Sequence, residues 1–143
     1  MIDHVWTVVC SNSVTDAESN NVSLLNVVEQ INVTGESMPG GVLPAQLDIV
    51  TLWSRADYQA PGRGYGRITF VSPSGPELGE PMEFPLDLSE HHRSRSRHRL
   101  VGLPLEQAGR YVFRVDFRNE NEDDWHQVAA VPIEVTFQPQ PGE

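Results

Sequence analysis

The sequence predicts an all-β protein, an antiparallel β-sandwich of about eight strands in one domain. First, apolar and charged residues alternate from Tyr111 to Arg118, which is typical of a strand with one buried face and one wet face. Second, short apolar runs recur along the chain, separated by turns rich in Gly, Pro, Asn and Ser. Third, no segment shows a convincing helical period.

Eight segments are predicted as strands. In chain order they are 4–10, 22–33, 45–57, 67–72, 81–88, 95–102, 110–118 and 125–137. A helix competes for 22–33, but Asn26, Asn32 and the β-branched residues there favour a strand. Pro85 indicates that 81–88 lies at a sheet edge. Polar or Gly/Pro-rich turns and loops are expected at 16–21, 35–44, 58–66 and 73–76.

The predicted core collects the in-phase apolar residues of these strands. They are Trp6, Val8, Leu25, Val27, Leu47, Ile49, Trp53, Phe70, Leu100, Tyr111, Phe113, Val115, Ile133 and Val135. One domain is expected over 1–137, followed by a disordered Pro/Gln tail at 138–143.

The segment before the seventh strand predicts a particular corner. Gly109 precedes Tyr111 by two residues, and we expect the tyrosine hydroxyl to bond backbone upstream of Gly109, a tyrosine corner. With Leu103, Gln107 and Phe113, this segment resembles the strand E–F corner of immunoglobulin-like domains. Gln107 replaces the usual Asp and Phe113 the usual Cys, so the resemblance implies an immunoglobulin-like sandwich without the inter-sheet disulfide.

The whole chain also resembles a bacterial family known only as a domain of unknown function. The resemblance lies in the strand, polar turn and strand at 8–16 and 21–28, and in the closing Gly-x-Tyr-x-Phe at 109–113. It implies a single-domain cytoplasmic immunoglobulin-like protein and brings no catalytic residues.

Charge and composition limit the partners. The chain carries 10 basic residues, all of them arginine, and 20 acidic residues, for a net charge of −10. Such an acidic surface argues against nucleic acid and anionic membranes as partners. No apolar run approaches the roughly 20 residues of a membrane span, and the acidic, short apolar N-terminus does not resemble a signal peptide. We therefore expect a cytoplasmic protein.

Four features were considered as sites of catalysis, cofactor or metal binding. Cys10 could act as a nucleophile with His4 or His126, but its phase with the core residues favours a buried structural thiol. The glycine-rich 61–66 lacks the following helix that a phosphate loop needs. The acidic 119–124 and 16–18 could bind calcium, and His91, His92 and His98 zinc, but neither set has ligand spacing. We expect no catalytic residue, no metal and no cofactor.

The most unusual stretch is an arginine stripe, defined as Arg93, Arg95, Arg97 and Arg99, which share one strand face. It is interpreted either as edge protection, or as pairing with an acidic loop within the monomer, or as a contact site for an acidic partner, another subunit or a phosphate-bearing ligand. The acidic residues are Glu120, Glu122, Asp123 and Asp124, of the same molecule or of a second copy.

Two functions follow from these features. The first hypothesis is a non-enzymatic protein-interaction module that binds a protein partner or self-associates, with a homodimer as one form. The alternative is a small-ligand or metal-binding sandwich that uses loops 58–66 and 119–124. An enzyme ranks third and would need a pocket with a perturbed His or carboxylate beside a hydroxyl.

Overall fold

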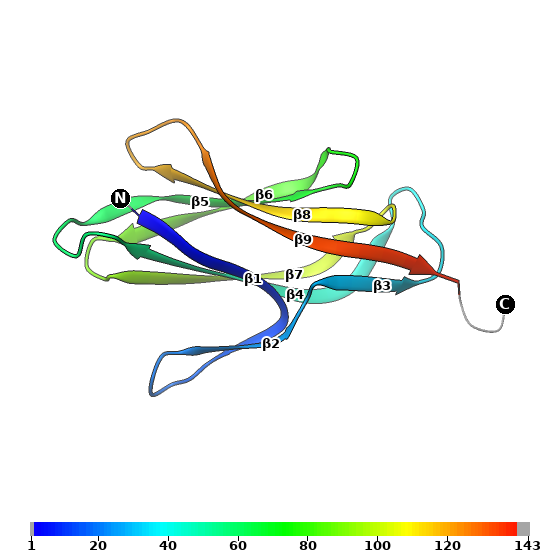
Figure 1. Cartoon of the computed structure of the whole chain (residues 1–143), viewed down its shortest axis with the longest axis horizontal. Helices are drawn as coiled ribbons and strands as arrows, with labels where there is room; N and C mark the ends of the chain where they lie inside the picture. Colours follow the sequence, from blue (N-terminus) through cyan, green and yellow to red (C-terminus); the bar gives the residue numbers. More distant parts are fainter. Residues whose placement is uncertain (1, 140–143) are drawn as a thin grey trace.

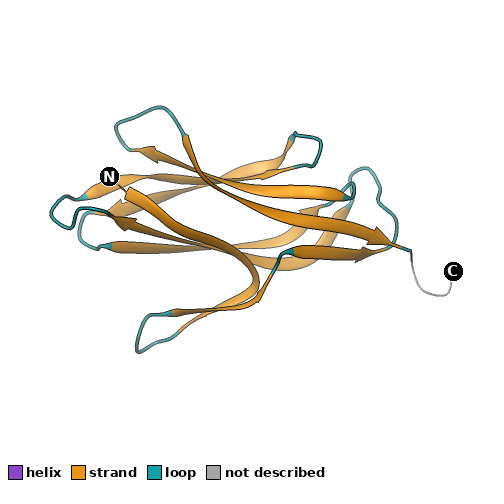
Figure 2. Cartoon of the chain, in the orientation of Figure 1, coloured by secondary structure: helices purple, strands orange, loops and turns teal. Residues whose placement is uncertain are grey.

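The computed structural model describes residues 2–139, which form nine strands packed as two facing sheets (Figures 1 and 2). The strands are β1 (Ile2–Thr15), β2 (Val22–Val27), β3 (Gln30–Thr34), β4 (Val42–Arg55), β5 (Gly62–Val71), β6 (Glu77–Leu88), β7 (Arg93–Pro104), β8 (Gly109–Asn119) and β9 (His126–Gln138). No helix occurs among these residues, so none there is suited to crossing a membrane. Most of the predicted tail lies outside residues 2–139, while Gln138 itself ends β9.

The first sheet has the strand order β2-β1-β4-β7 and is antiparallel throughout. The second sheet has the order β3-β9-β8-β5-β6 and is mixed, because β3 runs parallel to β9. The predicted all-β, two-layer architecture is confirmed. The predictions of about eight strands and of wholly antiparallel pairing are wrong.

Both corrections come from the segment 22–33, which is two strands instead of one. Asn26 adopts a positive φ of 55°, a left-handed conformation that Asn tolerates better than most residues. The Val28 amide then donates to the carbonyl of Val9 in the first sheet, and Glu134 in β9 donates to the carbonyl of Glu29. The chain therefore leaves the first sheet after β2 and enters the second as β3, where it runs parallel to β9.

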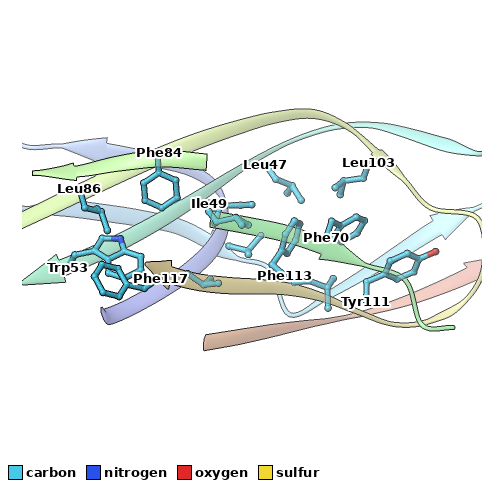
Figure 3. Packing of buried hydrophobic residues seen from close by; sticks show 14 of the residues in the cluster. Leu47, Ile49, Trp53, Phe70, Phe84, Leu86, Leu103, Tyr111, Phe113 and Phe117 are labelled. Carbon is cyan, nitrogen blue, oxygen red and sulfur yellow. The ribbon is translucent and has the colours of Figure 1, made fainter. Parts of the chain in front are cut away.

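The core fills the space between the sheets, and Figure 3 shows its aromatic and aliphatic packing. Nine of the predicted core residues are buried there: Leu47, Ile49, Trp53, Phe70, Tyr111, Phe113, Val115, Ile133 and Val135. Leu100 is partly buried against the same cluster. Leu25 and Val27 are 49% and 52% exposed, because β2 leaves the sandwich before its apolar side chains reach the core.

Trp6 and Val8 are also wrong as core predictions, because a bulge in β1 shifts the strand phase. The pairing of β1 with β4 slips between His4 and Trp6. The His4 ring therefore packs edge-on against Trp53 at 5.0 Å, and Val9 enters the core in place of Val8. Trp6 is only partly buried, beside Leu52 and Arg95.

The prediction for Tyr111 is confirmed. Its side chain is buried, and its hydroxyl accepts hydrogen bonds from the amides of Glu106 and Gln107 at 3.1 and 3.2 Å. The hydroxyl also donates to the Gln107 carbonyl at 2.9 Å. Gly109 takes a φ of 137°, which the turn into β8 requires and which side chains other than glycine rarely adopt.

A chain of polar side chains crosses the inner face of the first sheet. The Trp53 indole donates to the Thr51 hydroxyl at 2.7 Å, and Thr51 shares a short hydrogen bond with Ser96. Ser96 in turn lies 3.0 Å from Nε2 of His98, whose ring packs on Phe84 at 4.5 Å. Each of these buried or half-buried polar groups thus has a partner, as burial demands.

Candidate functional site

The arginine stripe lies on β7, an edge strand of the first sheet. The inner positions of β7 carry the polar chain of Ser96 and His98, whereas Arg99 pairs with Asp48 on the outer face, turned away from the second sheet. Arg93, Arg95, Arg97 and Arg99 are paired in register with Ser54, Leu52, Val50 and Asp48 of β4. Alternation along the strand therefore places all four arginines on that outer face, as the sequence predicts.

The β1–β2 hairpin reaches three of these arginines. Both terminal nitrogens of Arg95 donate to the carbonyl of Asn20 at 3.1 Å, and Arg97 reaches the Ser13 carbonyl at 3.5 Å. Arg99 contacts Oδ1 of Asn12 at 3.3 Å. In Figure 1 the hairpin (blue) projects from the sandwich on the side of the first sheet. The stripe therefore also holds the hairpin in place.

Asp48 lies beneath the arginine stripe and is not among the residues predicted from the sequence. Its carboxylate is fully buried and accepts from Nε of Arg99 at 2.9 Å and from the amide and hydroxyl of Ser13 at 3.1 and 3.0 Å. The Arg99 hydrogen bond, followed by that of Ser13, holds the pKa of Asp48 below its ordinary value. No local motif marks Asp48, because both partners lie more than 30 residues away in sequence.

The acidic residues Glu120, Glu122, Asp123 and Asp124 are exposed in the loop between β8 and β9. Arg118 donates to the Glu122 carbonyl at 2.7 Å, and His126 lies 3.5 Å from the Glu122 carboxylate. Among residues 2–139 no ion pair joins this loop to the arginine stripe. Figure 1 shows the loop (orange) and the β1–β2 hairpin on opposite sides of the sandwich. Pairing of the two sets within one monomer is therefore wrong.

Loops 58–66 and 119–124 meet at one end of the second sheet. The amide of Glu120 donates to the carbonyl of Arg63 at 3.2 Å. Together they border a shallow hollow of about 500 Å³, whose lining residues are Pro61, Gly62, Arg63, Ser89, Asn119, Glu120, Asn121 and Glu122. Within the described chain no three His, Cys, Asp or Glu side chains converge as a metal site.

A second surface was not predicted at all. On the second sheet, the Arg67 guanidinium lies 4.3 Å from the ring centre of Trp125, and Arg118 lies 4.6 Å from that of Tyr65 and 5.2 Å from that of Trp125. Arg67 also pairs with the buried Asp116 at 3.0 Å. These residues come from two strands, β5 and β8, and from the loop before β9, so only the fold brings them together.

The arginines of the two sheets differ in how their charge is balanced. On the second sheet, Arg63, Arg67 and Arg114 each pair with a carboxylate. On the first sheet only Arg99 does so. Within residues 2–139, no ion pair joins Arg93, Arg95 or Arg97 to a carboxylate, and the side-chain hydrogen bonds of Arg95 and Arg97 go to backbone and amide oxygens. Four arginines of one strand thus share the outer face of the first sheet, and among the described residues one of them, Arg99, forms an ion pair with a carboxylate.

The remaining candidates show no arrangement for chemistry. Cys10 is fully buried, and burial, followed by the nearby charge of Asp48, raises the pKa of its thiol. His4 packs on Trp53, and His126 is exposed beside Glu122. Of the three histidines considered for zinc, His98 points inward, whereas the His92 ring stacks on Tyr58 at 3.9 Å.

Comparison with known proteins assigns no family. No family model matches the chain, and no curated protein matches it in sequence. Among solved structures, the chain is similar to a family 123 glycoside hydrolase from Clostridium perfringens, with 12% identity and a TM-score of 0.41 over 82% of this chain and 24% of that one. It is also similar to the N-terminal domain of PorA, with 10% identity and a TM-score of 0.31 over 93% and 98% of the two chains. The chain thus spans 24% of the hydrolase, and neither likeness assigns a function.

Proposed function

We propose that this chain is a non-enzymatic, immunoglobulin-like protein-interaction module that binds acidic protein surface through the outer face of its first sheet. One observation carries the proposal. Arg93, Arg95 and Arg97 lie on one face with no carboxylate partner in residues 2–139, in a chain whose net charge is −10. Guanidinium groups bind carboxylates bidentately and remain charged at all physiological pH values, which suits such a contact.

The strand order supports the immunoglobulin-like part of the proposal. An immunoglobulin sandwich keeps its third, sixth and seventh strands in one sheet and its first, second, fourth and fifth in the other. When β1, β4, β5, β7, β8 and β9 take the first, second, third, fifth, sixth and seventh positions, these six strands fit this rule. Tyr111 then stands near the start of the sixth strand, where the tyrosine corner belongs. β6 departs from the constant-type plan, because it lies beside β5 in the second sheet, where the variable type carries its extra strands. β2 and β3 are additions to this plan.

The simplest acidic partner is a second copy of the chain. Glu120, Glu122, Asp123 and Asp124 provide exposed carboxylates on the side opposite the β1–β2 hairpin. The loop of one copy would therefore contact the stripe of the next. Such a contact gives a homodimer when both copies make it reciprocally. Otherwise it gives a ring or an open chain of copies.

The proposed setting is the bacterial cytoplasm. It rests on the resemblance to the bacterial family and on Cys10, which is buried and has no disulfide partner among the described residues. A reducing compartment suits such a thiol.

Sizing by analytical ultracentrifugation at low and high salt tests the proposal. The wild type should associate at low salt and dissociate at high salt, because screening weakens contacts between exposed charges. The variant R93S/R95S/R97S should remain monomeric, and Arg99 is retained in it because Asp48 depends on that residue. R63S/R110S removes two arginines elsewhere and should behave as the wild type. A wild type that stays monomeric under all these conditions would exclude self-association.

A small-ligand site at loops 58–66 and 119–124 is the second candidate. The hollow of about 500 Å³ between these loops favours it, since its lining is rich in amide, hydroxyl and carboxylate groups. The lining suits an uncharged polar ligand, such as a sugar, better than a metal ion. A thermal-shift screen of monosaccharides against the wild type and N119A/N121A tests it, and no stabilisation by any sugar would count against it.

A further inference from the structure

A hollow of about 510 Å³ lies where the β1–β2 hairpin crosses the outer face of the first sheet. Its lining residues are Trp6, Asn20, Asn21, Val22, Leu52, Arg93 and Arg95. The volume falls in the range of ordinary small-molecule sites, about 300 to 1,000 Å³. It is separate from the hollow between loops 58–66 and 119–124, with which it shares no lining residue.

The lining has two chemical halves. Trp6, Val22 and Leu52 supply apolar surface, and all three side chains are only partly buried. Covering the exposed parts of neighbouring tryptophan and leucine side chains with an apolar group lowers the free energy. This half of the hollow therefore suits a flat apolar body that can stack on the indole.

The other half carries two guanidinium groups. Arg93 and Arg95 are two residues apart and lie on the same face of β7, about 6.6 Å apart along the strand. No hydrogen bond or ion pair engages the Arg93 side chain within the described part of the chain. Arg95 commits two terminal nitrogens to the Asn20 carbonyl, and a guanidinium has five N–H donors in all. An anion between the two would relieve their mutual repulsion and receive several charge-assisted hydrogen bonds.

We propose that this hollow binds a small anion with a planar apolar body, in which a phosphate or carboxylate meets Arg93 and Arg95 while the aromatic part stacks on Trp6. Neither half suffices alone. A bare anion would leave Trp6 and Leu52 in water, and a neutral aromatic would leave the two guanidinium groups without a counter-charge. The ligand class is therefore an aryl phosphate or an aryl carboxylate.

The proposal shares Arg93 and Arg95 with the proposed protein contact but does not depend on self-association. The apolar half of the hollow distinguishes the ligand site from the protein contact. The ligand site needs Trp6, whereas an acidic protein partner needs only the arginines. Bound ligand would also compete with an acidic protein for these two side chains.

Isothermal titration with 1-naphthyl phosphate, at protein concentrations where the chain is monomeric, tests the proposal. The compound should bind with 1:1 stoichiometry, and inorganic phosphate and 1-naphthalenemethanol should each bind at least tenfold more weakly. R93S/R95S should weaken binding at least tenfold, and R93S alone severalfold. R93S is the safer variant for folding, because no hydrogen bond or ion pair engages the Arg93 side chain within residues 2–139. R110S/R114S, which removes the same charge from the second sheet, should leave the affinity unchanged.

Three results would overturn the proposal. The first is an absence of saturable binding by the wild type. The second is an equal loss of affinity in R110S/R114S and R93S/R95S, which would show attraction by net charge alone. Trp6→Leu distinguishes the two proposals, since it should weaken 1-naphthyl phosphate severalfold and leave the salt-dependent sizing profile intact. An unchanged affinity in Trp6→Leu would likewise overturn the site, even if the sizing profile still supports the protein contact.

Discussion

Arg99 and Asp48 form an ion pair in which Nε lies 2.9 Å from Oδ1 and the carboxylate has no exposed side-chain surface. The arginine itself remains 43% exposed. Asp48 is therefore a buried charge that is compensated by one partly exposed cation and by Ser13. This relationship separates Arg99 from the other three arginines of the stripe, whose described contacts are with oxygen atoms of the hairpin or with solvent.

Arg99→Gln should lower the melting temperature by several degrees, because it leaves the Asp48 carboxylate buried without its cation. Arg97→Gln is the comparison variant and should lower the melting temperature less, since the Arg97 charge acts on Asp48 without a direct hydrogen bond and its described hydrogen bond is a long one to the Ser13 carbonyl. Asp48→Asn in the R99Q background should recover part of the loss. Thermal unfolding followed by circular dichroism measures all three, and equal effects of R99Q and R97Q would contradict this role of the pair.

Tyr111→Phe should reduce the free energy of unfolding by about 1 to 3 kcal/mol. The substitution keeps the ring and its packing on Phe70 but removes the oxygen that bonds the amides of Glu106 and Gln107. Urea unfolding measures the change. Tyr58→Phe is the control at an exposed tyrosine, and similar effects at both positions would show that the corner contributes nothing specific.

Gly66→Ala should cost about 1 to 3 kcal/mol of unfolding free energy, because a Cβ at this position would overlap the ring of Phe84 on the neighbouring strand. The smaller side chain in Phe84→Leu should make room for it. The double variant G66A/F84L should therefore lose less stability than the sum of the single variants. Strict additivity in a double-mutant cycle would show that the two residues do not compete for space.

His98 should make stability depend on pH in the mildly acidic range. Burial lowers its pKa below the ordinary value of 6.5, so the folded state binds fewer protons than the unfolded state just below pH 6.5. The contribution of His98 to the free energy of unfolding is thus present above about pH 6.5 and is lost as the pH falls through the folded pKa. The pKa of Asp48 is also lowered, from the ordinary value of 3.8. The stability that Asp48 contributes is therefore likewise lost as the pH falls through its folded pKa.

The measurement is the unfolding free energy of wild type, His98→Gln and His91→Gln between pH 7.5 and 5. His98→Gln should flatten the curve, with a remaining slope from His4, whose pKa burial also lowers. His91 is exposed, so His91→Gln should follow the wild type. A wild-type slope that His98→Gln leaves unchanged would assign the acid sensitivity to other groups.

The sequence was most informative where a strand has one buried face. The alternation from Tyr111 to Phe117 predicted β8, its core residues and the hydroxyl contact of Tyr111, because parity alone decides which side chains face the other sheet. Parity failed in β1, where the bulge near Trp6 reverses it, and in 22–33, where Asn26 turns the chain between sheets. Both are backbone irregularities that side-chain periodicity does not record.

The residues of the candidate site were likewise only partly predictable from the sequence. The shared face of Arg93, Arg95, Arg97 and Arg99 was predictable from spacing along one strand. Asp48 was not, since its partners Ser13 and Arg99 come from two other strands that the tertiary fold brings beside β4. The hollow at Trp6 was hidden for a related reason, because the hairpin that borders it had no predictable direction.

A charge-exchange experiment tests the proposed contact between the stripe and the acidic loop most directly. R93D/R95D/R97D makes the stripe acidic, and E120R/D123R/D124R makes the loop basic, while Arg99 and Asp48 are kept in both. Each variant alone should stay monomeric at low salt, because like charges then face one another. Sedimentation velocity of the equimolar mixture should show a 1:1 complex that salt dissociates. A mixture that remains monomeric while the wild type associates would contradict the account.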